Sequence, residues 1–117
     1  MKKSNESYVQ AEIVQWFRNN YCLKHHNPRY EIFSVPNESA YNNNQFKAMG
    51  VRSGVSDLIV LLKEKVLFIE LKNEVGKQRE SQKDFETLVQ RLGFDYYLIR
   101  TLEEFKTIIE NETTHRQ

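Results

Sequence analysis

Two apolar runs separated by only three residues constrain the fold more than any other feature of this chain. The first run is residues 57–62, Asp-Leu-Ile-Val-Leu-Leu, and the second is residues 66–72, Val-Leu-Phe-Ile-Glu-Leu-Lys. Nearly every residue in them is apolar, which is typical of central strands covered on both faces. Three residues are too few for a parallel crossover, so the runs predict an antiparallel hairpin.

The remaining segments predict helices around a sheet that contains this hairpin. Apolar residues recur at helical spacing in three segments, and two others are rich in strand formers. Ser7 and Gln10 suit a capping box at the start of the first helix, while Gly50 and Gly93 suit helix ends. In chain order we expect a helix at 7–23, a strand at 30–35, a short helix at 45–49 and two strands at 57–62 and 66–72. A helix through 85–92, a strand at 95–100 and a helix from 102 follow. The fold class is therefore α/β.

Length and composition limit the organisation of the chain. Its 117 residues suit one domain, with a core at about 7–110 and a frayed tail at 111–117. The 17 basic and 16 acidic residues give a net charge of +1, which argues against a basic nucleic-acid coat protein. Any contact with nucleic acid must then be a local patch.

The sequence favours a reducing, cytoplasmic environment. Cys22 is the only cysteine, which excludes an internal disulfide framework, a four-cysteine zinc site and an iron–sulfur cluster. No apolar run approaches the roughly 18 residues that span a bilayer, and the first residues lead into no signal-peptide core.

Two carboxylates are predicted to meet at one end of the hairpin. Side chains alternate along a strand, so Glu70 and Lys72 share a face. If the hairpin loop is two residues, Lys63 and Glu64, or four residues symmetric about the same point, Asp57 lies opposite Glu70. Two opposed acids repel unless a cation or proton lies between them, and a hard divalent metal suits such a pair.

Each of these residues also has a purely structural interpretation. Asp57 suits a turn that starts a strand, and Glu70 with Lys72 suits an ion pair at a sheet edge. Taken together they favour a site, because ordinary solvation does not require an acid and an E-x-K at the same edge of a buried hairpin.

The motifs resemble a known nuclease family. Residues 50–58, Gly-Val-Arg-Ser-Gly-Val-Ser-Asp-Leu, followed by Glu70-Leu71-Lys72, Gly76 and Ser81-Gln82 before Phe85, are similar to the virus-type replication-repair nuclease (VRR-NUC) domain of the PD-(D/E)XK superfamily. The resemblance covers roughly residues 12–100. It implies a restriction-endonuclease-like core with a central mixed β-sheet flanked by helices.

Three further segments bear on this resemblance. Pro36-Asn37 and the segment Gly93 to Tyr97 fit the family pattern. Ser56 departs from it, because the superfamily name places a proline there. This position shapes the turn before Asp57 and leaves the acid pair in place.

The resemblance implies a metal-dependent phosphodiester hydrolase. Asp57, Glu70 and the backbone carbonyl of Leu71 would hold Mg²⁺, with Mn²⁺ also supporting activity, and Lys72 would orient and polarise the attacking water. Magnesium keeps several waters in near-octahedral oxygen coordination, so two carboxylates leave positions for a phosphate oxygen and the nucleophile.

Two more residues are candidates by this resemblance. Glu12 would be the acid contributed by the first helix, either as a ligand of the metal or of a second metal, or as a residue that contacts the metal ligands; its alternative is a solvated helix flank. Gln82 would stand beside the metal ligands; its alternative is a first-turn residue that satisfies backbone groups near a Ser81 cap.

Several side chains near the motifs suit sequence-independent contacts with DNA phosphates. For each of them the alternative interpretation is an ordinary solvated or turn residue. The candidates are Arg52, Lys77, Arg79, Lys83 and Asn37.

We therefore expect a metal-dependent endonuclease acting on structured or duplex DNA, four-way junctions included, in replication or repair in a bacterial cell or phage-infected host. A homodimer would match two-stranded substrates, with apolar surface supplied by Tyr8, Phe17, Tyr21 and Ile108-Ile109. The rivals are a DNA-binding or assembly module that keeps the fold without turnover, and a structural domain with no nucleic-acid partner.

Overall fold

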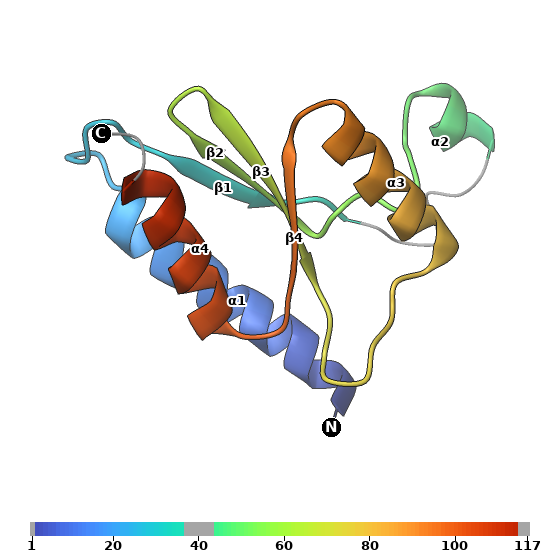
Figure 1. Cartoon of the computed structure of the whole chain (residues 1–117), viewed down its shortest axis with the longest axis horizontal. Helices are drawn as coiled ribbons and strands as arrows, with labels where there is room; N and C mark the ends of the chain where they lie inside the picture. Colours follow the sequence, from blue (N-terminus) through green and yellow to red (C-terminus); the bar gives the residue numbers. More distant parts are fainter. Residues whose placement is uncertain (1, 37–43, 115–117) are drawn as a thin grey trace.

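The computed structural model describes residues 2–36 and 44–114, which form a four-stranded sheet with helices packed on it (Figure 1). The eight elements follow one another in the predicted order, and the α/β class is confirmed. They are α1 (Lys2–Tyr21), β1 (Glu31–Ser34), α2 (Asn44–Ala48), β2 (Leu58–Leu62), β3 (Lys65–Leu71), α3 (Glu80–Arg91), β4 (Asp95–Ile99) and α4 (Leu102–Thr114). None of these helices is long and apolar enough to cross a membrane.

The sheet is mixed, with strand order β1-β2-β3-β4. The pairs β1–β2 and β2–β3 are antiparallel, and β4 runs parallel to β3. Leu62 lies opposite Lys65, so the hairpin turn consists of Lys63 and Glu64, the shorter of the two predicted loops. Leu58 lies opposite Ile69, which brings the preceding Asp57 to the level of Glu70. The predicted register is therefore confirmed.

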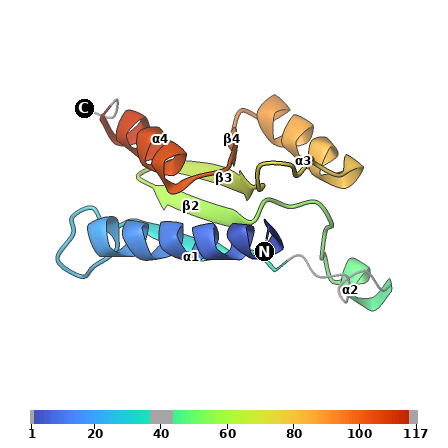
Figure 2. The same cartoon turned by 90° about the horizontal axis from the view of Figure 1, so that it is seen from below.

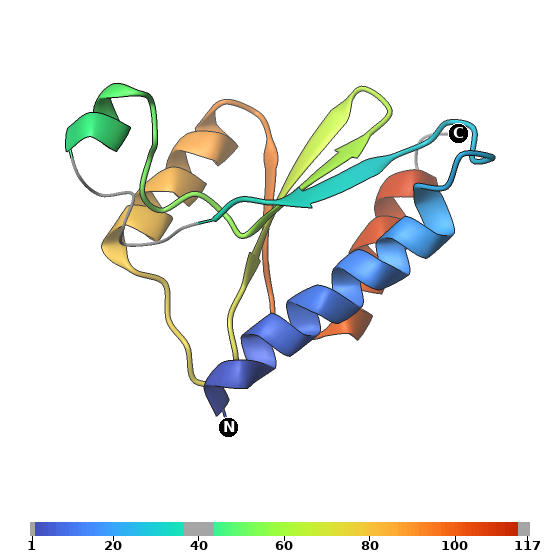
Figure 3. The same ribbon diagram turned by 180° about the vertical axis from the view of Figure 1, so that it is seen from behind.

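Helices α1 and α4 lie side by side against one face of the sheet (Figures 1 and 3). A row of opposed strand residues, Ile32, Val60 and Leu67, is fully buried on this face. Phe17 of α1 and Phe105 of α4 are also fully buried, and their rings meet edge to face with centroids 5.9 Å apart. This layer is the main core, because burial of bulky apolar side chains supplies most of the stabilising free energy.

The opposite face is covered over only part of its width. Helix α3 packs on β4 and buries Phe85 and Val89 against Tyr96. Leu61 of β2 remains 38% exposed and Phe33 of β1 remains 42% exposed. The prediction that both apolar runs are covered on both faces is thus wrong for β2, because α3 does not extend over it; α2 stands apart from the sheet (Figure 2).

Two helix ends differ from the sequence prediction. Helix α1 begins at Lys2, so Ser7 lies inside the helix and the capping box predicted for it is wrong. Helix α4 continues to Thr114, although the sequence predicted fraying from Asn111. Its last turns are tied to the sheet by Glu112, which accepts a 2.6 Å hydrogen bond from the Tyr97 hydroxyl and a 2.6 Å contact from the Lys65 ammonium. Such partly buried charged hydrogen bonds oppose fraying.

Candidate active site

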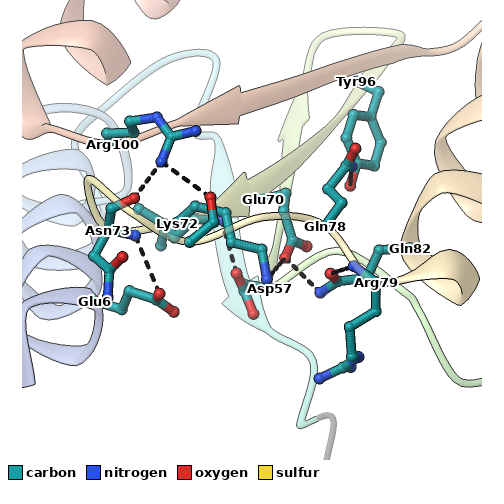
Figure 4. A network of polar contacts seen from close by, with 12 residues as sticks. Glu6, Asp57, Glu70, Lys72, Asn73, Gln78, Arg79, Gln82, Tyr96 and Arg100 are labelled. Atoms are coloured by element: carbon teal, nitrogen blue, oxygen red, sulfur yellow. Dashed lines mark hydrogen bonds and ion pairs between the residues drawn. The ribbon is translucent and has the colours of Figure 1, made fainter. Parts of the chain in front are cut away.

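Asp57 and Glu70 lie together where the β2–β3 hairpin meets the start of α3 (Figure 4). The Glu70 side chain is 1% exposed, and Asp57 is half-buried. One Asp57 oxygen, Oδ2, accepts a 2.8 Å hydrogen bond from the backbone N–H of Leu71. The structure therefore brings the two predicted acids to one point and fixes one of them to the strand that carries the other.

The environment of this pair disfavours two negative charges. Burial raises the pKa of Glu70 to about 8, and the neighbouring Asp57 charge adds to the increase. Burial also raises the pKa of Asp57, against the opposing effects of the Leu71 hydrogen bond and of Lys72. The pair therefore favours a proton or a cation beside it.

The two oxygens of Glu70 differ in their partners. Oε2 accepts a 2.7 Å hydrogen bond from the Gln82 amide and lies 3.7 Å from the Lys72 ammonium. Oε1 is buried without a hydrogen-bond partner in the described structure. A buried acceptor without a partner costs free energy, so this oxygen is suited to a ligand that the polypeptide does not supply.

Gln82 makes both of the contacts that the sequence analysis gave as alternatives, one to a predicted metal ligand and one to the backbone at the start of α3. Its amide nitrogen donates to Glu70, and its amide oxygen accepts a 2.8 Å hydrogen bond from the backbone N–H of Arg79. Arg79, rather than Ser81, occupies the N-cap position of α3. Because both ends of the amide are engaged, Gln82 holds one Glu70 oxygen in a fixed position.

The loop that carries Asp57 packs directly on the first turn of α3. Gly54 has φ +87°, and a Cβ atom there would lie 2.3 Å from the carbonyl oxygen of Ser81. Only glycine permits both this backbone conformation and this approach. In the next turn Ser56 is fully buried and donates a 3.2 Å hydrogen bond to the Leu58 carbonyl, so a hydroxyl shapes the turn where the nuclease pattern has proline.

The acid that α1 brings to the site is Glu6. Its carboxylate accepts a 3.1 Å hydrogen bond from the backbone N–H of Asn73, and its charge raises the pKa of Asp57. Glu12 lies six residues later, about 9 Å along the helix and about 120° around it. It is half-buried and is not among the main causes of the pKa shift of either acid. The structure thus does not bring Glu12 to the pair, and sequence reasoning missed Glu6.

Solved structures share this architecture. No family model and no curated protein matches the sequence. A solved "VRR_NUC domain protein" superposes with a TM-score of 0.69 at 22% identity, covering 91% of this chain and 85% of that one. A second solved structure, "VRR_NUC domain", gives 0.62 at 20% identity over 91% and 95% of the two chains. The fold is that of a VRR_NUC domain.

Within this VRR_NUC fold, the loop after β3 is held over Lys72. The Arg100 guanidinium donates to the carbonyls of Asn73 and Gly76 (Figure 4). Gly76 lies against the Lys72 stem, since a Cβ atom at Gly76 would be 3.3 Å from Cδ of that lysine. Arg100 therefore supports the loop that orients Lys72, a role with no signal in the sequence, where it simply follows a strand.

The predicted DNA-contacting residues occupy different positions relative to the acids. Arg79 is exposed, and its charge lowers the pKa of both Asp57 and Glu70. The Arg52 guanidinium lies 5.1 Å from the centroid of the Phe85 ring, at the surface. Lys77 and Lys83 are exposed, and Asn37 lies outside the described residues. Of this predicted set, the structure brings Arg79 into the electrostatic field of the pair.

The donor set suits magnesium better than a metal that needs many side-chain ligands. Within residues 2–36 and 44–114, no three His, Cys, Asp or Glu side chains gather into a metal-binding group. Magnesium commonly binds through one or two carboxylates and keeps several waters for substrate oxygens to replace. Asp57 and the unpartnered Oε1 of Glu70 fit that pattern.

Proposed function

We propose that this chain is a metal-dependent endonuclease that hydrolyses phosphodiester bonds in structured or duplex DNA, four-way junctions included. The observation that carries the proposal is the buried, unpartnered Oε1 of Glu70 beside Asp57, at the end of a hairpin in a VRR_NUC fold. A buried acid pair of this kind is costly, and a divalent cation would relieve it.

The acids and Lys72 would have different roles in the reaction. Asp57, Glu70 and the backbone carbonyl of Leu71 would hold Mg²⁺ or Mn²⁺, which when bound polarises a phosphoryl oxygen and lowers the pKa of a water. Lys72, whose ammonium lies 3.7 Å from Glu70 Oε2, would orient the attacking water and stabilise charge developing on the phosphate. Gln82 would keep Glu70 in position, and Glu6 replaces Glu12 as the acid from α1.

Phosphate contacts would come from the cations around this point. Arg79 is the first candidate because it already acts on the acid pair. Arg52, Lys77 and Lys83 would add contacts that do not depend on base sequence. Such contacts suit recognition of DNA shape, and replication or repair intermediates are substrates of this kind.

Incubation with labelled linear, flapped and four-way-junction DNAs tests the proposal. Cleavage should occur with Mg²⁺ or Mn²⁺ and stop with chelator. A metal-loaded protein that binds these DNAs without cutting any of them would instead support the rival function, a DNA-binding module that keeps the nuclease fold.

A homodimer is part of the proposal, with only part of the predicted surface available: Tyr8 is 67% exposed. Phe17 and Ile109 are fully buried in the core and are not available for an interface. Apolar side chains on the partly covered sheet face, Phe33 and Leu61, are exposed. Light scattering should give about twice the monomer mass of 14.0 kDa. A monomer that persists on a bound junction would leave a single-strand nicking enzyme.

A further inference from the structure

We propose that the groove between α1 and the edge strand β1 binds the sugar–phosphate backbone of the DNA strand that leaves the active site. This subsite rests on the proposed function, because it extends that substrate away from the acid pair. The groove has a volume of about 320 Å³ and is lined by Ser7, Gln10, Ala11, Val14, Arg18 and Ser34.

The groove begins at the catalytic end of the molecule on both of its walls. On the helix wall, Ser7 follows Glu6, whose carboxylate acts on Asp57. On the strand wall, Ser34 precedes Val35, whose N–H donates a 2.9 Å hydrogen bond to the Asp57 carbonyl. In Figure 3, α1 and β1 diverge from the loop that joins them toward this end. A strand bound at the acid pair therefore meets the groove directly.

The chemistry of the lining suits a phosphodiester backbone. Four of the six lining residues carry hydrogen-bonding side chains, one of them is a cation, and none is a carboxylate. Arginine, serine and glutamine side chains and backbone N–H groups are the usual donors to phosphate oxygens. Ala11 and Val14 supply a short apolar floor that suits a deoxyribose.

The edge strand adds a backbone donor to the same wall. Ile32 directs its carbonyl out of the sheet, where it accepts a 3.3 Å hydrogen bond from Arg18. Because alternate residues of an antiparallel edge strand turn both backbone groups outward, Ser34 directs its N–H toward the groove. Arg18 is thus anchored by one guanidinium nitrogen while the others remain able to donate.

The dimensions match a short length of strand. Ser7 and Arg18 are eleven residues apart on one helix face, which corresponds to about 16 Å. At about 3.4 Å per nucleotide along one strand, the groove covers between four and five nucleotides. Arg18 would therefore contact a phosphate several nucleotides from the cleaved bond and affect binding more than chemistry.

The test compares Arg18→Gln with Arg91→Gln, since each arginine is exposed in the last turn of its helix and only the first lines the groove. Binding of a 24-base-pair duplex is followed by fluorescence anisotropy in chelator across a salt series. Arg18→Gln should raise Kd at least about fivefold and lower the salt slope by about one. Arg91→Gln should change neither. Arg18→Lys should recover the salt slope.

Equal behaviour of Arg18→Gln and Arg91→Gln would overturn the groove proposal, and so would wild-type protein that does not bind the duplex. If Arg18→Gln lowers the melting temperature, Gln10→Leu tests the same wall and should raise Kd without changing the salt slope. Magnesium-dependent cleavage by the wild type is measured separately. If the wild type cleaves DNA and Arg18→Gln binds it normally, the groove proposal fails and the proposed nuclease function stands. If Arg18→Gln weakens binding but the wild type does not cleave, the nuclease function fails and the groove stands as a DNA-binding site.

Discussion

Strand β3 carries a polar cluster at each end, and the two clusters differ in how their charged groups are partnered. At the first end, the Lys65 ammonium lies 2.9 Å from Asp95 and 2.6 Å from Glu112, which also accepts a hydrogen bond from Tyr97. At the other end, the Lys72 ammonium is 3.7 Å from Glu70, and one Glu70 oxygen has no hydrogen-bond partner among the described residues.

This difference distinguishes a cluster that stabilises the fold from one that is suited to bind a ligand. The Lys65 cluster ties α4 to β3 and β4 through short contacts, and the acids raise the pKa of Lys65, so its charged form is favoured. The Glu70 cluster has the opposite property, because burial raises the pKa of its acids and disfavours their charged forms. Shifted pKa values of this type are commonly found at functional sites.

The largest expected effect is a loss of DNA cleavage when an acid is replaced at one end of β3 and not at the other. Glu70→Ala should abolish metal-dependent DNA cleavage while the protein stays folded, because it removes a predicted metal ligand. Glu112→Gln should leave the cleavage rate unchanged and lower the free energy of unfolding by about 1 kcal/mol, through the loss of a charged partner for Lys65 and Tyr97. Cleavage assays and urea unfolding of both variants check this, and an active Glu70→Ala protein would contradict the site.

The second effect compares the two lysines. Lys72→Ala should lower the cleavage rate at least about a hundredfold with little change in metal affinity, the scale of a positioned catalytic group. Lys65→Ala should change stability alone. Single-turnover rates at saturating Mg²⁺, measured beside Mg²⁺ titrations, separate the two outcomes; equal rate losses in both variants would remove the special role of Lys72.

Two glycines, one near each end of β3, test how tightly the loop that carries Asp57 packs on α3. Gly54→Ala should lower the free energy of unfolding by about 2 kcal/mol or more, because the new Cβ would collide with the Ser81 carbonyl at a positive φ. Gly93 has φ +93° with nothing within 4 Å of a Cβ atom, so Gly93→Ala should cost only the backbone strain, about 1 kcal/mol. Urea denaturation gives both values. Equal losses would show that the contact between loop 50–57 and α3 is loose.

The last effect is a pH dependence of stability in metal-free protein. The folded-state pKa of Glu70 is raised from 4.5 to about 8, so the folded state holds a proton that the unfolded state has lost. Stability should therefore fall as pH rises from about 4.5 to 8, and Glu70→Gln should flatten that fall. Lys65 does not contribute in this window, because its pKa is raised above 10.5. Unfolding in chelator at pH 5.5 and 8.5 checks this; parallel slopes would contradict it.

The sequence predicted the hairpin and the acid pair because strand alternation and a two-residue turn leave one register. The helix starts were harder to predict. Residues 2–6 contain no apolar side chain at helical spacing, so the pattern began at Ser7, and the acid expected from α1 was Glu12 instead of Glu6. Glu6 is placed by a hydrogen bond from Asn73, 67 residues away in sequence.

Contacts between distant segments also explain the other differences. Arg100 contacts the loop at Asn73 through tertiary structure alone, and periodicity carries no signal for such a contact. The continuation of α4 to Thr114 depends on Lys65 in the hairpin. The open part of the sheet follows from where α3 lies, and apolar runs report only that a strand can be buried.

The shift in melting temperature caused by Mg²⁺ tests the metal site most directly. Wild-type protein, Glu70→Gln and Lys65→Ala are melted in chelator and in excess Mg²⁺. Mg²⁺ should raise the melting temperature of the wild type and of Lys65→Ala, because a ligand that binds the folded state stabilises it. Glu70→Gln should melt higher than the wild type in chelator, since it relieves the buried charge repulsion, and should not respond to Mg²⁺. An equal Mg²⁺ shift in Glu70→Gln, or none in the wild type, would contradict a metal site at Asp57 and Glu70.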